Sequence, residues 1–168
     1  MVLTPVRCTT RRSPALVIFC WLALACSSPL DPAGPLPVTP LVQRGTSASP
    51  DFAQQNLVVR DAQTWETTWA ALYKGVSPRP ALPGVDFARD LVVVVSMGGK
   101  PTAGYSVAVS TADEASGAIT VGITQTAPGS SCVLPQIVTN PVAVARIPFH
   151  SASERVTFKT TSVVHPCS

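Results

Sequence analysis

The sequence predicts an α+β domain in which one amphipathic helix packs on a mostly antiparallel β-sheet of about five strands. Three observations lead to this prediction. Apolar residues recur at helical spacing within residues 62–74. The segments that follow either alternate apolar with small polar residues or form runs of β-branched residues. Only 12% of the chain is charged, which favours an exported β-rich protein over a helical cytosolic enzyme.

The first 25 residues have the order of a secretory signal. Three arginines precede an apolar run of about 11 residues at positions 15–25, and no acidic residue occurs before Asp31. The run is too short to span a membrane as a helix, which takes roughly 20 residues. We therefore expect residues 1–25 to be a signal peptide and the protein to be exported.

The end of this signal, Leu22-Ala23-Leu24-Ala25-Cys26, resembles the bacterial lipobox. The resemblance implies that residues 1–25 are a lipoprotein signal peptide and that Cys26 receives a diacylglyceryl group, which anchors the protein in the cell envelope. Ser27 is not the aspartate that commonly retains lipoproteins at the inner membrane, so the outer membrane is favoured. The alternative is an ordinary signal peptide followed by a coincidental cysteine.

Removal of the signal leaves a chain with no net charge. The full sequence has 12 Lys and Arg and 9 Asp and Glu, and three of the arginines lie in the signal, so 9 residues of each sign remain. No basic patch that would favour a nucleic-acid partner is left. The remaining 143 residues are enough for one domain with its own core.

The cysteines predict one disulfide. Cys8 and Cys20 lie in the signal and Cys26 is the anchor, so Cys132 and Cys167 remain as an even pair in an oxidising compartment. Their bond would close a loop of about 35 residues and contribute roughly 3–4 kcal/mol to stability in the chain-entropy model. The alternative, a pair of zinc ligands, is disfavoured because no histidines cluster with them.

Residues 26–50 are predicted to be a proline-rich tether. Proline every few residues prevents a helix and removes backbone donors, so the segment should be extended and semi-rigid. Disorder without a spacing role is the alternative. The folded domain is expected to span residues 51–168.

The helix is predicted at residues 62–74, after a short strand candidate at 56–60. Asp61 is expected to be its N-cap, and Gly75 follows its end. Its apolar face consists of Trp65, Trp69, Leu72 and Tyr73. The two tryptophans should cover one face of the central strand.

The remaining strands follow in order. The run Leu-Val-Val-Val-Val at residues 91–95 predicts a strand buried on both faces. Residues 105–110 and 119–124 alternate, and the turn-rich segment 113–117 between them predicts an antiparallel hairpin. Two further strands are predicted at residues 142–147 and 155–159.

The candidate functional surface is the loop at residues 97–105, Met-Gly-Gly-Lys-Pro-Thr-Ala-Gly-Tyr. Glycines near both ends give backbone freedom and the proline fixes φ between them. The loop is not a phosphate-binding P-loop, because Val94 and Pro101 stand where that motif needs a glycine and a serine or threonine. The predicted partner-binding residues are Gly99, Lys100, Pro101, Thr102, Gly104 and Tyr105. The alternatives are a plain glycine-shaped connection and, for Tyr105, a ring buried in the core.

Several motifs occur in a recognisable order. They are the two helix tryptophans, Val85-Asp86-Phe87, the apolar strand, Gly-Lys-Pro-Thr-Ala-Gly-Tyr-Ser-Val at 99–107, Ala127-Pro128-Gly129 and Thr139-Asn140-Pro141. Over about residues 54–160 this order resembles the PrcB C-terminal domain, although family members often carry a second glycine where this chain has Ala103. The family is named for a lipoprotein subunit of a bacterial surface protease complex. The resemblance implies a lipid-anchored accessory module and supplies no catalytic residues.

The same loop is also similar to the Asn-Pro-Thr-Thr-Gly-Tyr/Phe loop of chagasin-type cysteine protease inhibitors. Residues 100–105 keep its Pro, Thr, Gly and Tyr. The Arg-Pro-Trp segment of that family is missing, because Arg79-Pro80 is followed by Ala81.

The sequence does not indicate catalysis. The two histidines are His150 and His165, no Gly-x-Ser-x-Gly motif occurs, and no zinc or calcium ligand cluster is visible. We therefore expect no enzyme activity, no cofactor and no metal. The predicted function is that of an accessory subunit or partner of an extracytoplasmic protease. The alternative is a protease inhibitor that uses the Gly99–Tyr105 loop.

Overall fold

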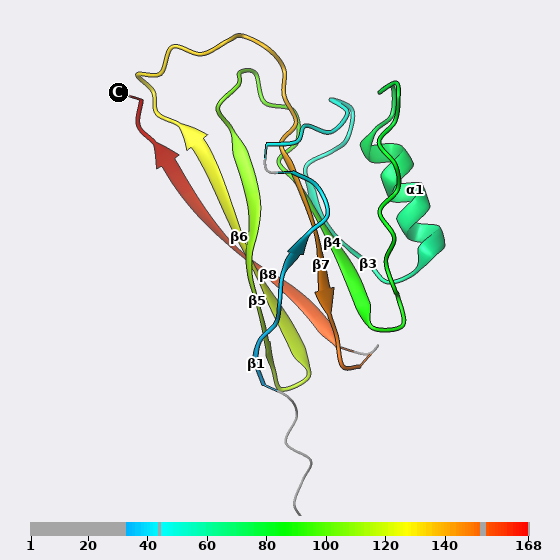
Figure 1. Ribbon diagram of the computed structural model, residues 1–168. Helices are drawn as coiled ribbons and strands as arrows, with labels where there is room; N and C mark the ends of the chain where they lie inside the picture. Colours follow the sequence, from blue (N-terminus) through cyan, green and yellow to red (C-terminus); the bar gives the residue numbers. More distant parts are fainter. Residues whose placement is uncertain (1–32, 44, 152–153, 168) are drawn as a thin grey trace, which may run out of the picture.

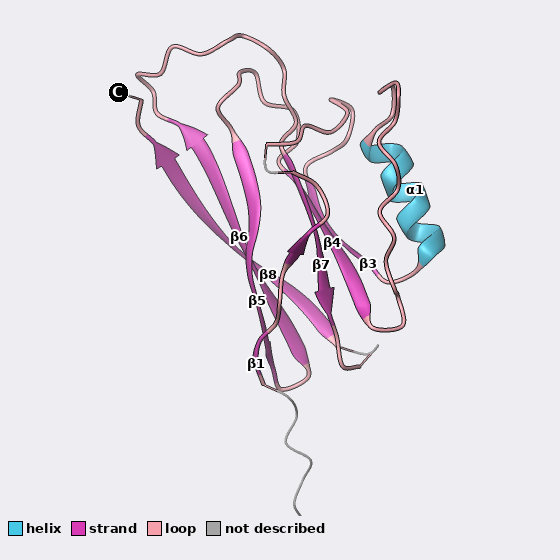
Figure 2. Cartoon of the chain, viewed as in Figure 1, coloured by secondary structure: helices cyan, strands magenta, loops and turns pink. Residues whose placement is uncertain are grey.

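The computed structural model describes residues 33–43, 45–151 and 154–167. The predicted signal peptide, Cys26 and the first part of the predicted tether lie outside these residues. The described chain forms one helix and two four-stranded sheets (Figures 1 and 2). The elements are β1 (Gly34–Pro35), β2 (Thr39–Pro40), β3 (Gln55–Val59), α1 (Ala62–Leu72), β4 (Asp90–Ser96), β5 (Ser106–Ala115), β6 (Ala118–Pro128), β7 (Val142–Pro148) and β8 (Arg155–His165).

The α+β prediction is confirmed in its main features, but the single sheet of about five strands is wrong. One sheet has the strand order β1-β5-β6-β8 and the other β2-β7-β4-β3. The predicted β5–β6 hairpin is present and antiparallel. The segment after β7 crosses to the other sheet, where β8 pairs parallel with β6. The connections β4–β5 and β7–β8 thus each run from one sheet to the other.

Strand β4 is buried on both faces, as its continuous apolar run predicts. On one face Val92 and Val94 share a core with Trp65 and Trp69 of α1. On the other face the odd-numbered residues of β4 pack with apolar side chains of β5 and β6. The domain therefore has three layers, with α1 outside the sheet that contains β4 (Figure 1).

Helix α1 begins where the sequence predicts and ends two residues early. Asp61 is its N-cap, and the carboxylate accepts 2.8 Å hydrogen bonds from the backbone N–H and the hydroxyl of Thr64. These bonds, the backbone one first, lower the pKa of Asp61. The last helical residue is Leu72, because Tyr73 has left helical backbone geometry. Within the described ranges, no helix has the length and apolar character needed to cross a membrane.

The proline-rich segment after α1 runs back along the helix and satisfies its buried indoles. The Trp65 Nε1–H donates to the carbonyl of Pro83 at 3.0 Å, and the Trp69 Nε1–H donates to that of Pro80 at 2.9 Å. The prolines thus do more than end the helix, because their carbonyls accept from donors that would otherwise be buried without partners.

Part of the predicted tether belongs to the fold. β1 pairs antiparallel with β5, β2 pairs antiparallel with β7, and Ala48 and Ser49 are buried. Each short strand lies at the edge of its sheet, where a proline without an N–H is tolerated. The predicted domain start at Asp51 is therefore corrected: the described fold extends back to Gly34.

Candidate functional site

The predicted functional loop connects β4 of one sheet to β5 of the other at one end of the domain (Figure 1). Two of its glycines are required by the backbone. Gly98 has φ +69° and Gly104 has φ +91°, values that favour glycine. A Cβ at Gly98 would also lie 3.0 Å from Cβ of Gln54. Any other residue at Gly98 or Gly104 would therefore strain the loop backbone.

A second loop, residues 129–139, holds the first in place. The backbones of Lys100 and Thr139 exchange two hydrogen bonds, with N···O distances of 2.6 and 3.0 Å. The Thr139 hydroxyl donates to the carbonyl of Thr102, and the Ala103 N–H donates to the carbonyl of Pro135. We call residues 98–105 and 129–139 together the loop end of the domain.

The predicted disulfide is present and fixes the loop end to the last strand. Cys132 and Cys167 are bonded, with their Cα atoms 5.2 Å apart. Beside the bond, the Gly129 N–H donates to the carbonyl of His165 at 2.9 Å. The second loop is therefore held at one side by the first loop and at the other by the end of β8.

Asn140 is buried directly behind the loop end and connects three segments. Its Nδ2 donates to the carbonyls of Ser49 and Phe52, at 2.9 and 2.7 Å. Its Oδ1 accepts from the Ser96 hydroxyl, which in turn accepts from the Gly98 N–H. This fully buried side chain joins the start of the functional loop to residues 49–52.

The predicted partner-binding residues are only partly available at the surface. Gly99, Pro101 and Gly104 are exposed. Lys100, Thr102 and Tyr105 are half-buried. The Tyr105 ring packs against the core between the sheets, and the Lys100 ammonium lies 5.8 Å from the ring centroid. The interpretation of Tyr105 as a core residue is therefore partly correct.

Sequence reasoning missed three apolar side chains of the second loop. Val133 is 99% exposed, Val138 64% and Ile137 55%. Single exposed apolar residues are ordinary, but three lie on this one loop. The available signal was the two apolar pairs Val133-Leu134 and Ile137-Val138, which lie outside any strand or helix pattern.

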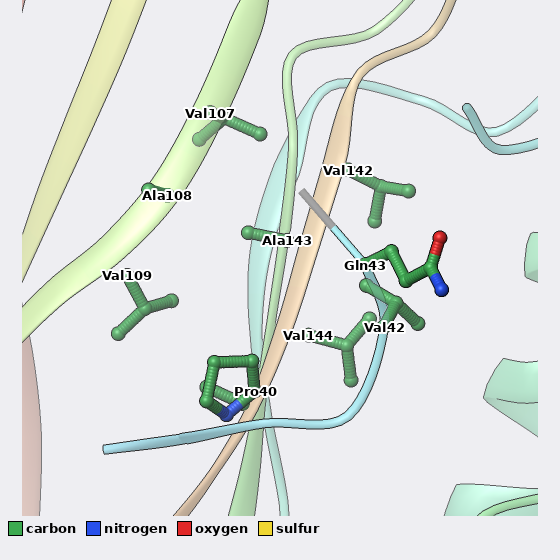
Figure 3. Close-up of a pocket in the computed structure, with 10 residues that line it drawn as sticks. Pro40, Val42, Gln43, Val107, Ala108, Val109, Val142, Ala143 and Val144 are labelled. Atoms are coloured by element: carbon green, nitrogen blue, oxygen red, sulfur yellow. The ribbon is translucent and has the colours of Figure 1, made fainter. Parts of the chain in front are cut away.

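An apolar pocket lies between β5 and β7 (Figure 3). Val107 and Val109 line it from β5, Val142 and Ala143 from β7, and Pro40 closes it from β2. Its volume is about 100 Å³. Pockets for drug-sized ligands measure roughly 300 Å³ or more, so this pocket does not suit such a ligand.

These features define a mostly β, three-layer domain that presents two interlocked loops at one end. A protein-family model described as PrcB C-terminal matches residues 91–148. The matched segment runs from β4 to β7 and contains both loops of the loop end, so the predicted resemblance is confirmed there. No curated protein and no solved structure matches the chain.

Proposed function

We propose that this protein is a non-catalytic, lipid-anchored protein of the cell envelope that binds another protein through its loop end. The partner is an extracytoplasmic protease, for which the chain acts as an accessory subunit or binding partner. The observation that carries the proposal is the match to the PrcB C-terminal family over the segment that forms the loop end. That family is named for a lipoprotein subunit of a protease complex.

The construction of the loop end supports a role in protein binding. Backbone hydrogen bonds, the disulfide and Asn140 hold the two loops in one arrangement before any partner arrives. A preorganised surface loses less conformational entropy on binding than a flexible one. The exposed side chains of Val133, Ile137 and Val138 supply apolar surface that a partner could bury.

The position of the predicted anchor supports the same role. Gly34 pairs with Glu114, whereas the functional loop enters β5 at Ser106. The eight steps along β5 from Ser106 to Glu114 span roughly 26 Å at about 3.3 Å per residue. A lipid on Cys26 would therefore be attached through the end of the domain at which Gly34 lies, opposite to the loop end.

The binding surface can be tested with charged substitutions at the loop end. Lys100→Glu, Thr102→Arg and Val133→Asp should each leave the free energy of unfolding within about 0.5 kcal/mol, because these side chains are exposed or half-buried. Each should reduce, by about tenfold or more, recovery of the partner crosslinked to the chain in native envelopes. Val76→Asp is the matched control, since Val76 is an exposed valine outside the loop end. Equal recovery with all four variants would show that the loop end is only a connection.

The anchor is tested separately. Cys26→Ala should move the protein from the membrane fraction to the soluble envelope fraction, because the lipid acceptor is removed. Blocking lipoprotein signal cleavage with globomycin should make the unaltered chain accumulate as its precursor. Membrane retention of the variant together with normal processing under globomycin would contradict the anchor and leave the loop-end test unaffected.

Protease inhibition is the second candidate function, favoured by the rigid support of the Gly99–Tyr105 loop at Lys100 and Thr139. Under the accessory-subunit proposal, the purified chain should leave the activity of a papain-like protease unchanged. If the chain inhibits the protease and Thr102→Arg removes this inhibition, the inhibitor function is supported in place of the accessory-subunit function.

A further inference from the structure

Three side chains with metal-binding chemistry meet at the end of the domain opposite the loop end. Glu114 lies on β5, and His150 and Glu154 lie in the connection from β7 to β8. One ligand atom of each lies within 4.8 Å of the others. No metal site was expected, because the sequence shows no cluster of zinc or calcium ligands. Glu114 and His150 are 36 positions apart in the chain. The crossing from one sheet to the other brings them together.

Two of these side chains are buried carboxylates, and one of them has an unused oxygen. Glu114 is 4% exposed and Glu154 6%. Oε1 of Glu154 accepts from the backbone N–H groups of His150 and Ser151, at 3.1 and 2.7 Å. Oε2 of Glu154 is buried and has no hydrogen-bond partner among the described residues. A buried carboxylate oxygen without a partner is costly, so it marks a place where a ligand would stabilise the fold.

The positive charge around the cluster is incomplete. The His150 Nδ1 lies 2.6 Å from Oε2 of Glu114, so at most one imidazolium faces two carboxylates. Arg60 lies close by: its Nη2 donates to the backbone carbonyl of Glu154, its Nη1 is buried without a hydrogen-bond partner among the described residues, and its guanidinium carbon lies 5.6 Å from the Phe149 ring centroid. Among the described residues, no lysine or arginine forms an ion pair with either carboxylate. Arg60 offsets part of the negative charge of the two carboxylates, and the charge that remains favours binding of a cation at the cluster.

We propose that Glu114, His150 and Glu154 bind a divalent cation, for which Zn²⁺ fits best. One imidazole nitrogen and two carboxylate oxygens are ligands that zinc accepts in tetrahedral sites. The cation takes the place of the hydrogen bond between His150 and Glu114 and gives the unused oxygen of Glu154 a partner. Tetrahedral ligands at about 2.1 Å from zinc are about 3.4 Å apart, so ligand atoms that now lie within 4.8 Å of one another would approach by at most about 1.4 Å.

The surroundings provide a fourth ligand position and a structural role. A pocket of about 170 Å³, lined by Glu114, His150 and residues 33–36, adjoins the cluster and has room for a water ligand. Glu114 belongs to one sheet, and the other two residues belong to the connection that leaves the second sheet. Zinc therefore ties the two sheets together beside β1, independently of the proposed partner-binding function at the loop end.

The proposal is tested on the full chain, purified, stripped of metal with a chelator and titrated with ZnCl₂. Zinc should bind with one-to-one stoichiometry in calorimetry and raise the unfolding temperature. Glu154→Gln is the main variant, because glutamine keeps the Oε1 acceptor for the two backbone N–H groups while removing the charge. It should weaken zinc binding about tenfold or more and so give a smaller rise in unfolding temperature at the same zinc concentration. His150→Ala should do the same.

Two matched controls separate a built site from unspecific zinc binding. Asp113→Asn removes an exposed carboxylate next to Glu114 in the chain, and His165→Ala removes the other histidine. Both should bind zinc as the unaltered chain does. The proposal fails if the unaltered chain shows neither binding heat nor a thermal shift. It also fails if Glu154→Gln, folded by circular dichroism, binds zinc as tightly as Asp113→Asn.

Discussion

Replacing Asn140 with alanine is expected to lower the free energy of unfolding by about 3 kcal/mol. The substitution removes two donors and one acceptor from a fully buried position. The carbonyls of Ser49 and Phe52 and the hydroxyl of Ser96 lose their partner in a place that water does not reach freely. An unsatisfied buried polar group costs about 1–3 kcal/mol, and partial relaxation keeps the sum below three full penalties.

Chemical denaturation followed by tryptophan fluorescence measures this loss. Asn56→Ala is the matched control, since Asn56 is an exposed asparagine on β3, and its effect should stay within about 0.5 kcal/mol. The Gly98 amide should also exchange its hydrogen faster in Asn140→Ala, because its acceptor, the Ser96 hydroxyl, loses its own anchor. Equal stability of the two variants would show that Asn140 does not hold these segments together.

Loss of the Cys132–Cys167 disulfide is expected to lower stability by roughly 3–4 kcal/mol, because the bond closes a loop of 35 residues in the unfolded chain. The reduced protein and the double variant Cys132→Ser, Cys167→Ser should show the same loss. In the folded state, hydrogen exchange should increase in residues 129–139, which the bond ties to the end of β8. Binding of the partner should weaken in parallel, since the loop end loses part of its preorganisation.

The comparison of oxidised and reduced protein also checks the pairing itself. Thiol labelling under denaturing, non-reducing conditions should modify neither Cys132 nor Cys167. Stoichiometric labelling of both, or identical unfolding midpoints with and without reductant, would contradict the prediction.

The elements best predicted from the sequence are those that local patterns define. The i, i+4 spacing of Trp65 and Trp69 and the N-cap Asp61 predicted α1 to within two residues. The continuous run at residues 91–95 predicted a strand buried on both faces, and β4 is buried on both. The disulfide was predicted because two cysteines remain once those of the signal peptide and the anchor are set aside. In each case the signal lies in residues close in sequence or in a simple count.

The candidate site was predicted only in part. The loop at 98–105 was visible from its glycines and proline. Its partner loop was not, because the hydrogen bonds between Lys100 and Thr139 join residues far apart in the chain. Exposure of Val133, Ile137 and Val138 was equally hidden, since an apolar residue is expected inside until its surroundings are known.

The sequence by itself determined the helix, the paired hairpin β5–β6, the buried strand β4 and the disulfide, because each depends on short-range periodicity or on composition. The tertiary structure alone decided three features. It divided the strands into two sheets, it brought the prolines of β1 and β2 to the sheet edges, and it gathered Glu114, His150 and Glu154 into one cluster. These features depend on which distant segments pair, and pairing is selected by the burial of whole faces rather than by any local pattern.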